Sequence, residues 1–174
     1  MKIVIYGYSG SGKSTLANII SKEYELPVLH VDKILYNENW ERKSKEESKE
    51  LMASFLKLNN NRIIDGNGVS MLFEERMKMA DKIIFMNFSP WTCYKQAKKR
   101  YKEYKDKDRS SRPEGCKEKF DFSFKWWVLF EGRKKSRALK LNEPLKLYPE
   151  KSIVLTNEKE VTAFLSNLDN YLLK

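Results

Sequence analysis

The chain has 174 residues, of which 41% are hydrophobic and 33% charged, and its 34 basic side chains exceed its 24 acidic ones to give a net charge of +10. This length and composition are typical of one globular domain, and no apolar run approaches the roughly 20 residues that a bilayer-spanning helix needs. The apolar run at residues 3–6 is too short for a signal sequence, and the two cysteines form no C-x-x-C pair. We therefore expect reduced thiols and a cytoplasmic protein without a membrane partner. The positive charge favours anionic partners, such as nucleotides or nucleic acid.

The first expected strand, residues 2–6, leads into a glycine-rich sequence, GYSGSGKST, at residues 7–15. This sequence has the G-x-x-x-x-G-K-[ST] spacing of a phosphate-binding loop, or P-loop. Its glycines let backbone N–H groups curl around a phosphate, and the helix expected over residues 14–24 points its positive dipole end at the same place. We expect Lys13 to reach the β- and γ-phosphates of ATP and Ser14 to bind Mg²⁺. The residues predicted to bind ATP are Gly7, Ser9, Gly10, Ser11, Gly12, Lys13, Ser14 and Thr15.

The rest of the chain alternates between strand and helix patterns. Strands are expected at residues 28–31, 62–65, 82–88 and 152–156, and helices at residues 45–58, 72–79, 91–104 and 120–130, with a closing helix near the C-terminus. Between residues 105 and 112 the chain is dense in charge and is expected to be a surface excursion. Such alternation predicts an α/β fold, in which a parallel sheet is covered by helices on both faces, as one domain over residues 1–174.

Two acidic residues follow strands, at the sheet edge where ligands of such folds bind. Asp32 is expected to face the γ-phosphate, where it could accept a proton from an attacking hydroxyl or hold the acceptor in line; a helix cap or surface turn is the alternative. Asp65 follows Ile63 and Ile64, a pattern that favours an acid holding Mg²⁺ over a simple turn residue. His30, the only histidine, is expected to be a packed residue of the core or of the crevice wall, and a catalytic base is the alternative.

Arginines are the candidate clamps for phosphate, because phosphoryl transfer needs cations on the equatorial oxygens. Arg109 and Arg112 lie in the charged excursion, where a lid closing over a nucleotide would carry them, and Arg76 and Arg100 are further candidates. For each arginine the alternative is a surface ion pair.

Five segments of the chain together resemble the bacterial DNA topology modulation protein family, whose members are similar to adenylate kinases. The segments are GYSGSGKSTLA (7–17), LHVDKIL (29–35), IIDGN (63–67), ADKIIFMNF (80–88) and RPEGCKEKFDFSFKWW (112–127). This resemblance implies a three-layer P-loop fold with a five-stranded parallel sheet in the order 2-3-1-4-5 and a lid over about residues 105–120. It also implies that Lys13 and Ser14 bind ATP and Mg²⁺, that Asp32 lies on the acceptor side and that Arg109 and Arg112 are lid arginines.

Together these observations predict a kinase that transfers the γ-phosphoryl group of Mg-ATP to a small acceptor, such as a nucleoside or nucleotide. Its catalytic residues would be Lys13, Asp32, Arg109 and Arg112, with Ser14 and Asp65 at the metal. An acceptor pocket is expected to include Asp32, Trp40, Asn67 and Arg76. Two alternatives stay open: an ATP-dependent regulator that binds DNA through its basic surface, and a kinase for a small metabolite that is not a nucleotide.

Overall fold

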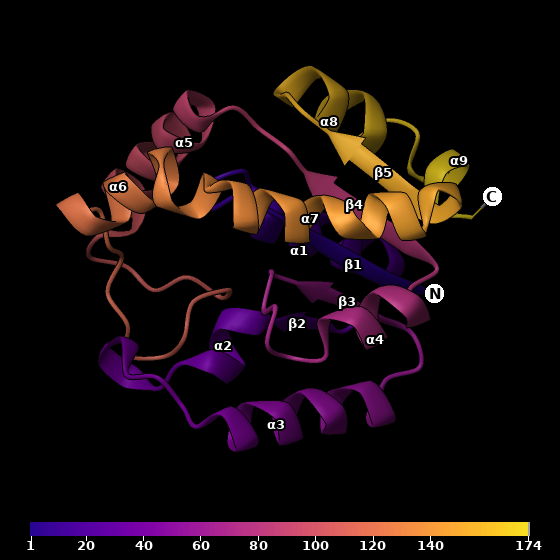
Figure 1. Ribbon diagram of the computed structural model, residues 1–174, viewed down its shortest axis with the longest axis horizontal. Helices are drawn as coiled ribbons and strands as arrows, with labels where there is room; N and C mark the ends of the chain where they lie inside the picture. The colour runs from indigo at the N-terminus through magenta and orange to yellow at the C-terminus, as the bar shows by residue number, and fades with distance from the viewer. Residues whose placement is uncertain (174) are drawn as a thin grey trace.

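A computed structural model describes residues 1–173 and contains one five-stranded sheet (Figure 1). All neighbouring strands are parallel, and their order, β2-β3-β1-β4-β5, confirms the predicted one. The strands are β1 (Lys2–Gly7), β2 (Val28–His30), β3 (Arg62–Asp65), β4 (Lys82–Met86) and β5 (Ser152–Leu155).

Helices connect and flank these strands. They are α1 (Lys13–Tyr24), α2 (Val31–Leu35), α3 (Lys45–Leu58), α4 (Phe73–Met79), α5 (Pro90–Tyr104), α6 (Phe122–Leu129), α7 (Lys135–Leu147), α8 (Glu158–Leu165) and α9 (Leu168–Leu172). Three short 3-10 turns complete the set: η1 (Glu38–Trp40), η2 (Glu131–Arg133) and η3 (Pro149–Lys151).

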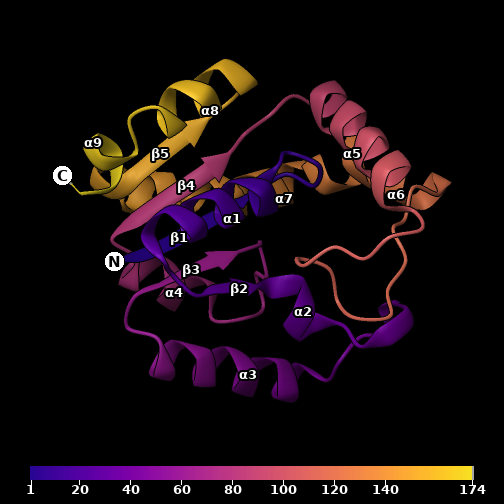
Figure 2. The same ribbon diagram turned by 180° about the vertical axis from the view of Figure 1, so that it is seen from behind.

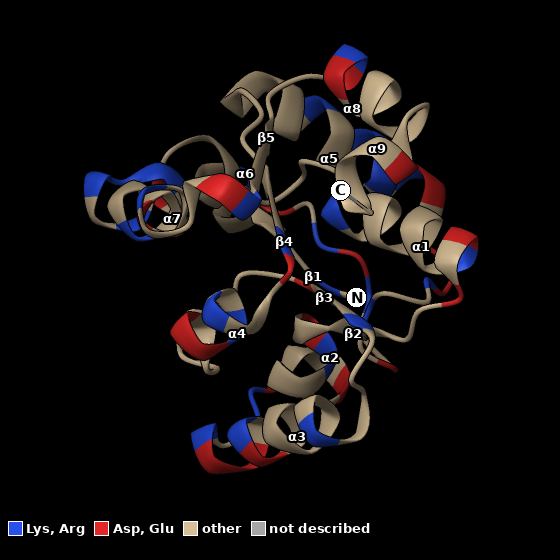
Figure 3. Cartoon of the chain, turned by 90° about the vertical axis from the view of Figure 1, so that its right-hand side faces the viewer, with Lys and Arg blue, Asp and Glu red and all other residues tan. Residues whose placement is uncertain are grey.

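The alternation of side chains along β1 builds a core on each face of the sheet. Ile3 and Ile5 pack with residues of α1 and α8, whereas Val4 and Tyr6 pack with residues of α3, α4 and α7. Figure 3 shows this arrangement, with α1, α8 and α9 on one side of the strands and α4 and α7 on the other. The predicted three-layer architecture is therefore confirmed.

The sequence prediction of the second strand was one residue too long, since Val31 begins α2. Asp32 therefore lies in the first turn of a short helix. The prediction also missed α7, which contains a proline, Pro144, in its interior. Proline usually ends a helix, so the sequence gives little sign that the helix continues there.

A loop over residues 105–121 connects α5 to α6 without helix or strand. We call this loop the lid segment. In Figure 2 it descends from α5 towards α2 and η1. Three hydrogen bonds anchor it there. The indole N–H of Trp40 donates to the carbonyl of Lys117 at 2.8 Å, the backbone N–H of Trp40 donates to the Sγ of Cys116 at 3.2 Å, and the thiol of Cys116 donates to the carbonyl of Asn37 at 3.2 Å. Within residues 1–173, no helix is long and apolar enough to cross a membrane.

Candidate active site

The P-loop connects β1 to α1 in the conformation that the glycine spacing predicts. Gly7 has a φ of +139°, and a Cβ there would lie only 2.4 Å from the carbonyl oxygen of Met86, so no other residue fits. Gly12, which precedes α1, is left-handed, and no side chain caps the helix start. The first backbone N–H groups of α1 thus stay available to an anion such as a phosphate.

Lys13 folds back over this loop. Its Nζ donates to the carbonyl oxygen of Tyr8 at 2.8 Å. Burial lowers the pKa of Lys13, while the nearby carboxylates of Asp65 and Asp32 act in the opposite direction. The ammonium group is therefore hydrogen-bonded to the P-loop and lies within the electrostatic influence of Asp65 and Asp32.

A buried pair, His30 and Asp65, lies where β2 and β3 end. The two residues are opposite each other in the strand register, and the Nδ1 of His30 lies 2.8 Å from the Oδ2 of Asp65. The other carboxylate oxygen, Oδ1, is buried without a hydrogen-bond partner among residues 1–173. This pairing fixes the orientation of Asp65 and leaves one oxygen without a protein partner.

Two oxygen atoms near this edge of the sheet could serve as ligands of Mg²⁺. The unpartnered Oδ1 of Asp65 and the hydroxyl of Ser14, in the first turn of α1, are oxygen ligands, which Mg²⁺ prefers. Within the described residues, no cluster of three or more His, Cys, Asp or Glu side chains could bind a metal ion. A magnesium ion in a P-loop site takes its remaining ligands from phosphate oxygens and water, so it needs no such cluster.

Asp32 shares this charged neighbourhood. Its side chain is exposed, yet the surrounding protein and then the charge of Asp65 raise its pKa above the ordinary value, whereas Lys13, Arg109 and Arg100 oppose this shift. A carboxylate with a raised pKa is a better proton acceptor.

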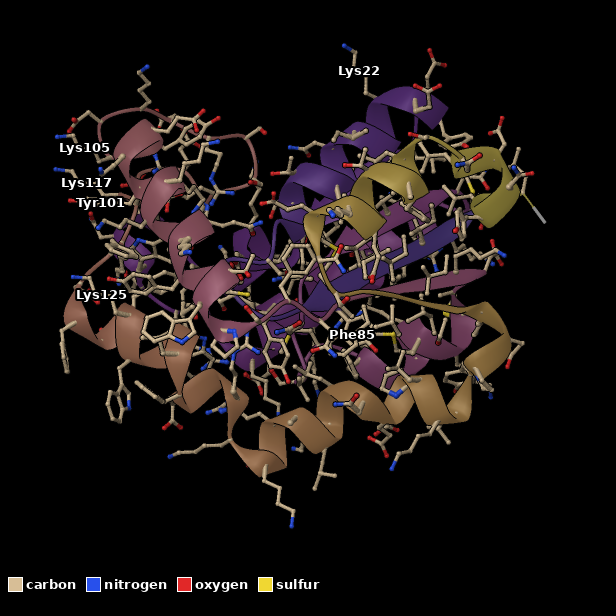
Figure 4. The ribbon with its side chains drawn as sticks, turned by 90° about the horizontal axis from the view of Figure 1, so that it is seen from above. Lys22, Phe85, Tyr101, Lys105, Lys117 and Lys125 are labelled. Atoms are coloured by element: carbon tan, nitrogen blue, oxygen red, sulfur yellow. The ribbon has the colours of Figure 1, made fainter. Side chains whose placement is uncertain are left out.

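An open cleft of about 1030 Å³ lies beside the P-loop. It is bounded by residues 10–15, by α5, by residues 108–111 of the lid segment and by α8. Figure 4 shows α1, which carries Lys22, facing the end of α5 near Tyr101 and Lys105. The size is within the range of small-molecule sites, and the phosphate-binding loop forms one wall.

The arginines occupy two different kinds of position. Arg100 and Arg109 line the cleft. Arg112 does not: it is buried, and its guanidinium donates to the carbonyl of Lys107 and to the carboxylate of Asp108. This placement corrects the prediction of Arg112 as a clamp facing the nucleotide, because its N–H groups hold the lid segment together.

Arg76 also lies elsewhere than predicted. Only 1% of its surface is exposed, and its guanidinium donates to the carbonyls of Gly66, Asn67 and Gly68. A Cβ at Gly68 in this loop would lie 2.6 Å from the Cγ1 of Val31 in α2 and 3.4 Å from the Nη2 of Arg76. The structure therefore corrects the assignment of Arg76 to the acceptor pocket, since Arg76 holds the loop after β3 against α2.

Replacing this arginine tests the correction. Arg76→Met is expected to lower the free energy of unfolding by about 2–3 kcal/mol, because buried carbonyls lose a charged donor. Urea denaturation measures the change, and Arg42→Met, at an exposed position, is the control. If stability were unchanged and the KM for the acceptor were raised, Arg76 would instead belong to the acceptor pocket.

The remaining two residues of the predicted acceptor pocket, Asn67 and Trp40, each connect two segments of the chain. The side-chain oxygen of Asn67 accepts from the backbone N–H of Gly7 at 2.9 Å and so connects the loop after β3 to the P-loop. Trp40, with a left-handed φ of +63°, joins η1 to the lid segment through its indole N–H. Both lie at the carboxyl side of the sheet, and their contact with an acceptor stays a prediction.

Sequence reasoning missed three contributors to the site. The pairing of His30 with Asp65 could have been found, since both residues end strands predicted to be neighbours. Glu118, a buried acid among the lid arginines, gave no signal, because the lid segment has no periodicity. Arg133 likewise gave no signal: its guanidinium lies 3.8 Å from the ring of Tyr8 in the P-loop.

Solved structures of kinases are similar to this chain over nearly its whole length. Shikimate kinase from Bacteroides thetaiotaomicron matches with a TM-score of 0.57 at 16% identity, covering 100% of this chain and 99% of that one. Deoxyadenosine kinase from M. mycoides with bound dATP gives 0.53 at 18% identity and covers 100% of both chains. A sugar kinase from Janibacter sp. HTCC2649 gives 0.52 at 14% identity, covering 98% and 93%. At these identities the likeness shows the fold alone, which this chain shares with these three kinases.

A family model described as an AAA domain, AAA_18, matches residues 3–116, more than half of the chain. The chain therefore belongs to this family. A comparison with curated proteins finds no match.

Proposed function

We propose that this protein is a Mg-ATP-dependent phosphotransferase that acts on a hydroxyl group of a small acceptor. The observation that carries the proposal is an open cleft lined by Lys13, Arg100 and Arg109, with Asp32 and Asp65 close enough to influence the charge of Lys13. Phosphoryl transfer needs little else from a protein than such positioned charges.

Each group has a role in this proposal. The P-loop amides and Lys13 hold the β- and γ-phosphates, and Arg109 and Arg100 neutralise charge that develops on the transferred group. Asp32 accepts the proton of the attacking hydroxyl and keeps it in line. Ser14 and Asp65 would hold Mg²⁺, which would supply positive charge to offset the charge of the phosphates.

Finer predictions from the sequence belong to the same proposal. They are a nucleoside or nucleotide as the acceptor, a cytoplasmic location and membership of the DNA topology modulation protein family. A non-nucleotide acceptor remains compatible with the same donor residues.

A panel of acceptors tests the proposal. Nucleosides, nucleoside monophosphates and small hydroxy-metabolites are each mixed with Mg-ATP, and ADP release is compared with the hydrolysis rate without acceptor. We expect at least one hydroxyl acceptor to raise ADP release and to yield a phosphorylated product. No ATP binding by calorimetry, or ADP release that no member of the panel changes, would contradict the proposal.

The metal assignment has its own prediction. Asp65→Asn is expected to raise the Mg²⁺ concentration that gives half-maximal activity by about 10- to 100-fold. Since His30 would still find an oxygen at position 65, the pair itself is preserved. The Mg²⁺ dependence of ATP binding, measured by calorimetry without turnover, should shift in the same way. An unchanged dependence would remove Asp65 from the metal site.

A further inference from the structure

We propose that Glu118 is a positioning residue, which holds Arg100 and Arg109 by their Nε atoms and so presents their terminal nitrogens to the cleft. The inference rests on the proposed function, since it assigns the use of the two arginines to an ATP-binding site.

The geometry centres on one buried carboxylate. Only 2% of the Glu118 side chain is exposed. Its Oε2 lies 3.1 Å from the Nε of Arg100, and its Oε1 lies 3.0 Å from the Nε of Arg109. The Nη1 of Arg112 follows at 4.0 Å from Oε1. A single acid in the lid segment thus contacts all three of its arginine neighbours, and it is too buried to touch a ligand itself.

Arg100 and Arg109 contact Glu118 through Nε, whereas Arg112 approaches it with a terminal nitrogen. Within residues 1–173, Arg100 makes no side-chain hydrogen bond other than its Nε contact, and Arg109 adds only one, from Nη1 to the hydroxyl of Ser111. Their side chains are 30% and 18% exposed and line the cleft. In contrast, a terminal nitrogen of Arg112 donates to the carbonyl of Lys107 and to the carboxylate of Asp108, and its side chain is only 4% exposed. Terminal guanidinium nitrogens match phosphate oxygens in pairs, so two arginines are ready for an anion.

The charge of Glu118 also allows these arginines to be close together. Burial lowers the pKa of Arg100 and the positive charge of Arg109 adds to that effect, whereas Glu118 raises it. Two guanidinium groups that converge on one cleft repel each other before a phosphate arrives. A carboxylate between them offsets the repulsion and fixes their direction.

The segment that follows α2, on the side of the proposed acceptor, fixes the position of Glu118. The two preceding residues, Cys116 and Lys117, are the ones that bond to Asn37 and Trp40. Asn37 and Trp40 follow α2, the helix that carries Asp32. Glu118 therefore lies between the segment that bears the proposed base and the arginines of the donor cleft.

Comparing Glu118→Gln in two backgrounds tests this role. Basal hydrolysis of Mg-ATP provides kcat for every variant, since the arginines act on the γ-phosphate whichever nucleophile attacks, and calorimetry provides ATP affinity. In the wild-type background, Glu118→Gln is expected to misplace the two arginines. The substitution should therefore lower kcat about 10²-fold and change the affinity for ATP much less. In a background carrying Arg100→Lys and Arg109→Lys, the same substitution is expected to leave kcat nearly unchanged, because the Nε atoms it acts through are absent.

A structural role alone would give a different pattern. It would lower kcat by the same factor in both backgrounds, in parallel with the loss of thermal stability, and that result would overturn the proposal, as would an unchanged kcat in Glu118→Gln. Should Glu118→Gln fail to fold, Glu118→Asp keeps the charge but is too short to reach both Nε atoms, and the same comparison applies. Asp106→Asn is the matched control, because Asp106 is an 80% exposed lid acid paired with Lys105.

The outcomes also separate this proposal from the proposed function. A wild-type protein that binds and hydrolyses ATP while Glu118→Gln keeps its kcat contradicts only the role of Glu118. A wild-type protein that does not bind ATP contradicts both.

Discussion

Lys13→Met is expected to lower kcat by about 10²–10³-fold, as removal of a charge aimed at a transition state does in other enzymes. The methionine retains the length of the side chain, so the loop loses a cation but little packing. In the structure the ammonium group is held at 2.8 Å from the Tyr8 carbonyl and close to two carboxylates. The positive charge of Lys13 is therefore held at the loop that would bind the γ-phosphate.

ADP release at saturating Mg-ATP measures the effect, and circular dichroism verifies the fold. Lys49→Met is the matched control, since Lys49 lies exposed on α3, away from the P-loop. If Lys13→Met retained wild-type turnover, the loop would not be the site of phosphoryl transfer.

Asp32→Asn is expected to lower kcat by about 10²–10⁴-fold for hydroxyl acceptors, with a much smaller effect on the KM for ATP. Asparagine has nearly the same shape but cannot accept the proton. An acceptor that is already a phosphate needs no base, so for such an acceptor the substitution should have little effect. The variant therefore also classifies the acceptor, and Glu50→Gln, exposed on α3, is its control.

The pH dependence gives a second readout of Asp32. A general base works only when deprotonated, so kcat falls as the pH falls through the pKa of Asp32. Because desolvation by the surrounding protein and the Asp65 charge raise that pKa, the acid limb is expected above the ordinary aspartate value of about 4. The limb should disappear from the residual activity of Asp32→Asn. An identical acid limb in the variant would assign it to another group and remove Asp32 as the base.

The sequence predicted most of the fold because its signals are local. The P-loop spacing and the apolar strands each act within a few residues, and the structure has β1, α1 and β4 where these patterns indicate. Asp32 and Asp65 were found because parallel strands bring their ends to one edge.

What the sequence did not reveal depends on contacts between distant or irregular segments. Arg76 and Arg112 are satisfied by backbone carbonyls, and no pattern distinguishes such a buried arginine from one that faces a ligand. Glu118 becomes central only because residues 100, 109 and 118 converge after the lid segment folds. Helix α7 was missed because its interior proline, Pro144, contradicts local propensity.

The packing of Gly68 against Val31 restricts how this protein could evolve or be redesigned. Any larger residue at position 68 would collide with Val31, and the guanidinium of Arg76 fixes the loop by donating to the carbonyl of Gly68 at 3.0 Å. The spacing between the two strand ends that carry Asp32 and Asp65 is therefore hard to alter by single substitutions. New acceptor preferences would arise more readily at exposed positions after Asp32, such as Lys33 and Asn37, than at Ile34 and Leu35, which are buried with Val31 in the core.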